Sequence, residues 1–115
     1  MPRATLLVMA NSEPGHEEEF NRWYDQTHIP DVLKLPGFIS ARRFALSSHQ
    51  LPGFAAPGFQ YLTIWDIEAD DLALPLAAMA AAVGTPEMPI SKAMVVTGDR
   101  AVRTVLVQPV GQDER

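Results

Sequence analysis

The chain has 115 residues, with 9 Lys and Arg against 14 Asp and Glu and a formal net charge of −5 at pH 7. This acidic balance disfavours nucleic acid as the main partner, because phosphate binding needs a basic face. The chain has no Cys, which excludes disulfides and thiolate chemistry and suits a reducing cytosol. No apolar stretch approaches the ~18 residues of a membrane-spanning helix, and the N-terminus lacks a secretory signal pattern. We therefore expect a cytoplasmic protein with no membrane or nucleic-acid partner.

The first third of the chain predicts a strand followed by a helix. Residues 2–10 are apolar, with β-branched residues near the middle, and predict a strand buried on both faces. Residues 16–28 predict a helix whose first turn is acidic, as the helix dipole favours. Its 3,4-spaced apolar face comprises Phe20, Trp23, Tyr24, Thr27 and His28. Because Pro30 disfavours helix at the residue before it, we expect the helix to break or restart near His28.

A Pro-Gly turn opens the second predicted strand, residues 36–46. Alternation along this strand predicts one face with Phe38, Ser40, Arg42 and Phe44, and a second face that carries Arg43. The following segment, residues 47–58, is rich in Pro, Gly and Ser and predicts a long loop of the kind that often binds or covers ligands.

The second half of the chain repeats the order of strand, helix and strand. Residues 59–67 predict a strand with Phe59, Tyr61, Thr63 and Trp65 on one face. Residues 68–83 predict a helix that Pro75 either kinks or delays. After a loop that includes a possible short helix from Pro89, residues 98–110 predict the last strand.

The order β-α-β-β-α-β predicts an α+β, ferredoxin-like fold with helices on one face of a four-stranded antiparallel sheet. We expect a single domain over residues 1–110 and a polar tail over 111–115. The other sheet face would expose apolar side chains, which we expect to be Leu6, Val8, Ile39, Ala41, Leu62 and Ile64. Such a face predicts a homodimer with the two sheets packed against each other.

The segment EEEFNRWYDQTHIPDVLKLPGFISARRF, residues 17–44, resembles the dimeric α+β barrel superfamily, and within it the EthD-like group and its small uncharacterised relatives. The resemblance rests on the aromatic helix, on His28-x-Pro30, and on the Pro-Gly-Phe that opens the second strand. It implies a pocket between the first helix, the loop after it and the helix-facing side of the sheet. Members include lactone isomerases, polyketide cyclases, cofactor-free monooxygenases and haem-using enzymes, so the resemblance specifies the fold more closely than the function.

His28 is the leading candidate for a catalytic residue, because a histidine titrates near the pH of the cell. Tyr24 and Asp31 lie within one helical turn of it and could orient its ring. The alternative is that His28 caps the helix C-terminus. Arg42, on the strand face with Phe44, is expected to point into the pocket and stabilise negative charge on the substrate. A one-residue slip in register would give this role to Arg43.

The remaining candidates form the expected pocket wall. They are Phe20, Trp23, Ser40, Phe44, Tyr61 and Trp65. For the aromatic side chains the alternative is core packing without a ligand, and the Tyr hydroxyls need a hydrogen-bond partner in either case.

The sequence offers no metal-ligand spacing among its three histidines and no P-loop, GxGxxG or GxSxG motif. We therefore expect no metal and no cofactor, although haem on His28 stays open because haem needs only one axial histidine and an apolar cavity. The leading hypothesis is a cofactor-independent enzyme that moves protons on a small hydrophobic carbonyl, enol or aromatic substrate. The alternatives are an oxidative enzyme, cofactor-free or haem-using, and a non-catalytic ligand-binding or stress-response protein.

Overall fold

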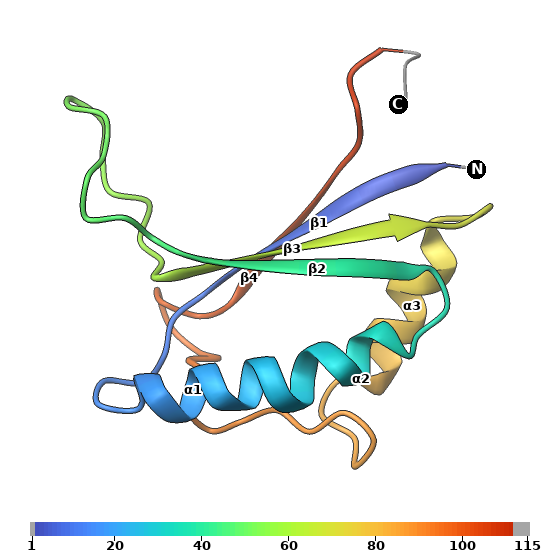
Figure 1. Ribbon diagram of the computed structural model, residues 1–115, viewed down its shortest axis with the longest axis horizontal. Coiled ribbons are helices and arrows are strands. Elements are labelled where there is room, and N and C mark those ends of the chain that lie inside the picture. Colours follow the sequence, from blue (N-terminus) through green and yellow to red (C-terminus); the bar gives the residue numbers. More distant parts are fainter. Residues whose placement is uncertain (1, 112–115) are drawn as a thin grey trace.

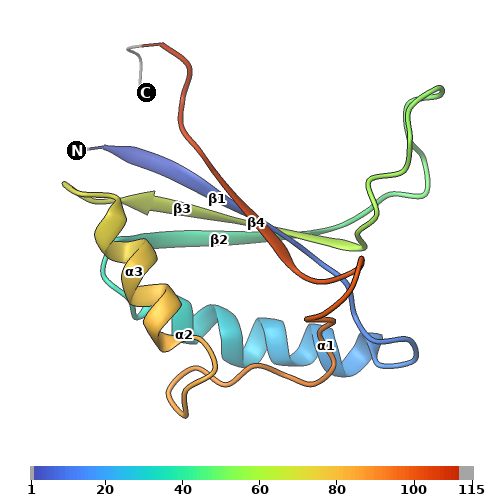
Figure 2. The same ribbon diagram turned by 180° about the vertical axis from the view of Figure 1, so that it is seen from behind.

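The computed structural model describes residues 2–111, in which a four-stranded antiparallel sheet has its helices on one face (Figures 1 and 2). The strand order in the sheet is β2-β3-β1-β4, as a ferredoxin-like fold requires. The elements are β1 (Arg3–Ala10), α1 (Glu17–Trp23), η1 (Tyr24–His28), α2 (Ile29–Leu33), β2 (Phe38–Ala45), β3 (Tyr61–Glu68), α3 (Ala73–Ala82) and β4 (Arg103–Val107). All but the first residue of the predicted polar tail lie outside the described residues.

The core lies between the sheet and the helices. Side chains from alternate positions of β1 and β3 face the helices, and Trp65 and Ile67 are almost fully buried there. The predicted face of the third strand is therefore confirmed. β1 was expected to be buried on both faces, but its other face is only half-buried, with Leu7 and Met9 on the open side of the sheet. Leu6 and Val8, which we expected on that open side, pack under the helices instead.

The predicted faces of β2 are wrong, because a β-bulge between Phe38 and Ser40 shifts the register by one residue. Phe38 is buried in the core, whereas the Ser40 hydroxyl donates a hydrogen bond to Asp66 on the open face. Beyond the bulge, Arg42 lies on the open face and Arg43 faces the helices. Ala41, expected on the open face, also packs against the core.

Of the two outcomes expected near His28, a break or a restart, the structure shows the restart: α2 begins at Ile29 with Pro30 in its first turn. The chain stays helical from Glu17 to Leu33 through a π-helical turn, in which the Ile29 amide donates to the carbonyl of Tyr24 five residues back. Pro30 has no amide hydrogen, and its ring clashes with a regular helical carbonyl. A wider π turn relieves that clash, so the proline distorts the helix without ending it.

The second half differs from the expectation mainly in length. α3 starts late, at Ala73, and places Pro75 in its first turn, which is one of the two expected outcomes. The expected short helix from Pro89 is a series of turns, and β4 covers only Arg103–Val107 of the predicted 98–110. Within the described part of the chain, no helix is long and apolar enough to cross a membrane.

Residues 47–58 form a projecting segment, here called the arm. Every one of its residues is exposed. Its base is closed by a hydrogen bond from the Leu46 amide to the Gln60 carbonyl. The arm rises on the side of the sheet away from the helices, as does the chain that follows β4 (Figures 1 and 2).

Candidate functional site

Tyr24 lies at the centre of an aromatic cluster between the helices and the sheet. Its ring is 5.6 Å from that of Phe20 and 5.0 Å from that of His28, measured between centroids. Trp65 approaches His28 edge-on at 6.0 Å. Tyr61 stacks on Phe20 at 4.9 Å. The structure thus brings together most of the predicted pocket wall, but side chains fill the space where we expected an open pocket.

His28 is buried in this cluster and is neutral at pH 7. Burial lowers its pKa to about 4, and the negative charge of Asp31 opposes that shift only in part. Its ring stacks on Trp23 at 4.8 Å. The alternative role of a helix C-terminal cap is wrong, because the helix continues to Leu33.

Arg43, and not Arg42, supplies the positive charge of the cluster. Its guanidinium donates to Asp25 at 2.9 Å and to Asn21 at 2.8 Å. The guanidinium carbon lies 4.5 Å from the centroid of the Tyr24 ring, which is cation–π distance. Arg42 lies on the opposite side of the sheet over Phe44, 6.0 Å from that ring, and Ser40 is also on that side. The bulge in β2 therefore removes Arg42, Phe44 and Ser40 from the cluster.

Three buried polar atoms around Tyr24 have no hydrogen-bond partner among the described residues. They are Nδ1 of His28, Nε1 of Trp65 and Nε of Arg43. An unpaired buried polar atom costs about 1–3 kcal/mol, and native proteins carry few of them. Burial raises the pKa of the Tyr24 hydroxyl, and the Thr63 hydroxyl, the charge of Arg43 and the nearby Trp65 indole N–H oppose the rise only partly. This hydroxyl therefore stays protonated and can donate.

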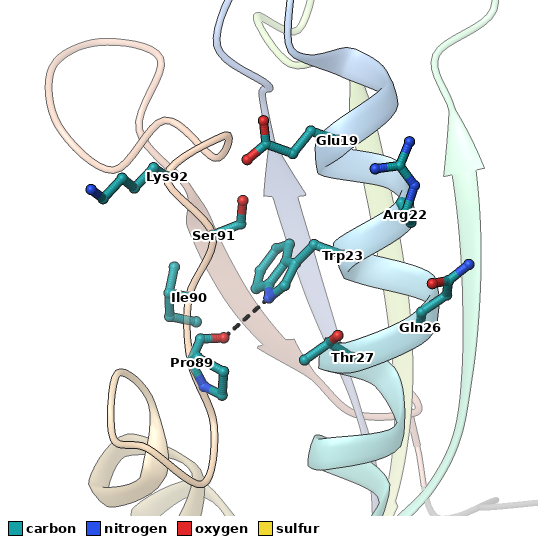
Figure 3. Close-up of a pocket in the computed structure, with 9 residues that line it drawn as sticks. All are labelled: Glu19, Arg22, Trp23, Gln26, Thr27, Pro89, Ile90, Ser91 and Lys92. Carbon is teal, nitrogen blue, oxygen red and sulfur yellow. Dashed lines mark hydrogen bonds between the residues drawn. The ribbon is translucent and has the colours of Figure 1, made fainter.

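A groove of about 390 Å³ runs along the outer side of the helix, between the helix and residues 89–92 (Figure 3). Its lining residues are Glu19, Arg22, Trp23, Gln26, Thr27, Pro89, Ile90, Ser91 and Lys92. The Trp23 side chain reaches across it, and its indole N–H donates to the Pro89 carbonyl at 3.1 Å (Figure 3). Because the same indole stacks on His28, Trp23 separates the groove from the buried histidine.

The groove is not the expected pocket, because the helix and residues 89–92 line it and no residue of the sheet does. Sequence reasoning identified Trp23 but missed residues 89–92. These residues belong to a loop that is fastened to the end of β1, where the Glu13 amide donates to the Ala93 carbonyl. No sequence pattern in the loop predicts that it pairs with the segment after β1. Across residues 2–111, no three His, Asp or Glu side chains are grouped to hold a metal ion.

Solved structures share this arrangement and confirm the class of fold expected from the resemblance. One is the haem degrader MhuD from Mycobacterium tuberculosis with two haems in its active site, 15% identical over 96% of this chain and 98% of that chain, with a TM-score of 0.59. Another is an ethyl tert-butyl ether D (EthD) family protein from Bacillus halodurans, 14% identical over 94% and 99%, with a TM-score of 0.55. The chain thus shares a ferredoxin-like α+β fold with these two proteins.

Residues 4–71 match the model of a family described as a domain of unknown function, DUF4286, and the chain belongs to that family. No curated protein matches the chain. At these identities the solved structures establish the fold alone, so the case for a function depends on the cluster and the groove.

Proposed function

We propose that the protein is a cofactor-independent enzyme that transfers protons on a small hydrophobic carbonyl compound, with His28 as the acid and base. The observation that carries the proposal is the state of His28. It is buried and neutral, its Nδ1 has no partner among the described residues, and one side chain, Trp23, separates it from a groove of about 390 Å³. The π-helical turn that holds it is a distortion frequently found at functional sites.

Access to His28 requires Trp23 to move. The movement breaks the hydrogen bond to the Pro89 carbonyl, which contributes about 0.5–1.5 kcal/mol, and uncovers one face of the imidazole. A ligand that enters from the groove would occupy the space that the indole leaves. Its reacting C–H would lie in the plane of the imidazole at Nδ1, where the lone pair of that nitrogen points.

In the proposed reaction, His28 takes a proton from the carbon next to the substrate carbonyl. The electrons of the broken C–H bond form a C=C bond, and the carbonyl oxygen becomes an enolate. The hydroxyl of Tyr24, held protonated by burial, donates to that oxygen, and the cation of Arg43 beside the Tyr24 ring stabilises the charge. Return of the proton to a different carbon completes an isomerisation, and return to the same carbon gives exchange with solvent.

The low pKa of His28 is compatible with this role. A base with a pKa of about 4 is unprotonated at pH 7, as proton abstraction requires. The enolate that forms next to it then stabilises the imidazolium, as does Asp31. The driving force for proton transfer therefore develops only when the substrate is present.

Haem, which the similar protein MhuD binds, does not fit beside His28 in this arrangement. Tyr24 and Trp65 meet the imidazole edge-on at 5.0 and 6.0 Å, and they stay in place when Trp23 moves. A macrocycle needs a wide flat slot next to the ligating nitrogen. No step of the proposed reaction uses haem.

We also propose that two copies associate through the open face of the sheet. Across the four strands this face presents the row Arg42, Ile64, Leu7 and Val105 and the row Phe44, Leu62, Met9 and Arg103. Val105 is 47% exposed and Phe44 45%. Arg42 has no ion-pair partner within residues 2–111, and within the same residues Asp66 has only the hydroxyls of Ser40 and Thr5. A second copy would cover the apolar rows and pair Arg42 with Asp66.

The test of the enzymatic proposal is exchange of carbon-bound protons with D₂O, followed by NMR, for aryl methyl ketones, cyclohexenones and butenolides. We expect acceleration of one class, and a ~10²–10⁴-fold loss of it in His28→Phe, which keeps the aromatic packing. His49→Phe, at an exposed histidine on the arm, is the matched control and should retain full activity. Binding without acceleration would identify a ligand-binding protein, and full activity in His28→Phe would refute the role of His28.

A further inference from the structure

The arm carries apolar side chains that its own chain leaves uncovered. Leu51 is 69% exposed and Phe54 75%. Together with Gln50, Ala55 and Ala56 they line a hollow of about 240 Å³ at the tip. Two large apolar side chains next to each other at the end of a projection are unfavourable in water.

The base of the arm is held in a defined direction. The Arg103 guanidinium donates to the Pro57 carbonyl at 3.4 Å, and the Asn11 amide donates to the Gly58 carbonyl at 3.2 Å. Within the arm, the Ser47 hydroxyl accepts from the His49 amide at 3.0 Å. These contacts connect the arm to β4 and to the end of β1, so its direction follows that of the sheet.

The uncovered tip and the open face of the sheet lie on the same side of the molecule (Figures 1 and 2). A second copy that packs on the open face would stand next to the arm, and by two-fold symmetry its own arm would stand next to the first copy. One partner therefore covers both apolar surfaces, whereas a monomer covers neither.

We propose that the arm of each copy packs its Leu51 and Phe54 against the other copy, so that the two arms clasp the dimer. This inference rests on the proposed dimer and is independent of the chemistry at His28. The arm is then an interaction segment between subunits and not a lid over the site of its own chain. The Trp23 groove is lined by the helix and residues 89–92 and by no residue of the arm, which fits this assignment (Figure 3).

The chain has no Cys, so a single introduced cysteine reports on one position without ambiguity. In Ala55→Cys the new thiol, at the arm tip, is labelled with a benzophenone maleimide and irradiated. The matched control is Ala77→Cys, an exposed position on α3 in the helix layer. We expect a cross-link between two chains from position 55 and none from position 77.

A second measurement is the dimer dissociation constant by analytical ultracentrifugation. We expect Leu51→Ser with Phe54→Ser to raise it at least ~10-fold, which is about 1.4 kcal/mol, while Leu74→Ser on α3 leaves it unchanged. Two results together would overturn the clasp: cross-links from position 55 only within one chain, and a dissociation constant that the double substitution leaves unchanged. The proposed dimer itself would not be affected by these results. A wild-type protein that stays monomeric would overturn both. Neither outcome bears on the proton-exchange assay.

Discussion

The burial of a neutral His28 predicts that the protein loses stability as the pH falls below about 6.5. The pKa of His28 is about 4 in the folded protein and ordinarily about 6.5 in an unfolded chain, so the unfolded chain binds more protons between these two values. Stability from this group is complete above pH ~6.5 and is lost as the pH falls towards 4. At 1.36 kcal/mol for each pKa unit, the loss reaches about 3 kcal/mol by pH 4.

The assay is urea denaturation of the wild-type protein and of His28→Phe, followed by tryptophan fluorescence from pH 7 down to pH 4. Carboxyl groups also titrate in this range, but they are common to both proteins and cancel in the difference. The difference in unfolding free energy should therefore change by about 3 kcal/mol in favour of the phenylalanine variant as the pH falls. His49→Phe should follow the wild-type curve. Parallel curves for wild type and His28→Phe would refute the burial of a neutral imidazole.

Two further predictions concern the arginines of β2. Arg43→Lys should lower the unfolding free energy by about 1–2 kcal/mol in thermal or urea melts, because a single ammonium nitrogen does not reproduce the planar guanidinium, which reaches Asp25 and Asn21 with two different nitrogens while it lies on the Tyr24 ring. A change below about 0.5 kcal/mol would argue against Arg43 as an organiser of the cluster. Arg42→Asp and Asp66→Arg should each weaken association of the copies ~10-fold or more in analytical ultracentrifugation, and the double substitution should restore it; equal weakening in the double variant would contradict their pairing across the interface.

The periodicity of the sequence was sufficient to predict the architecture. Alternation in β3 placed Tyr61 and Trp65 correctly towards the helices, because every second residue of a regular strand shares a face. The 3,4 spacing of Phe20, Trp23 and Tyr24 likewise placed them in one cluster. Both spacings depend only on neighbouring residues of one strand or one helix, so the folded protein retains them.

The errors arose where one residue breaks a regular repeat. The bulge in β2 has no Gly or Pro at Ile39 to mark it, so strict alternation assigned Arg42 to the wrong side. Pro30 predicts a break or a restart near His28, but it does not predict the π turn that joins the two helices there. The groove could not be predicted at all, because it depends on a loop near residue 90 that meets the helix only in the folded chain.

The central claim is that a ligand from the groove reaches the unpaired nitrogen of His28. Long-range ¹H–¹⁵N NMR of the histidine rings tests it most directly, with the carbonyl compound that exchanges fastest as the added ligand. We expect His28 to be neutral at pH 7 without ligand, and its Nδ1 resonance to shift on addition while that of His49 does not. A ligand that undergoes catalysed exchange but leaves both His28 nitrogen resonances unchanged would contradict the account.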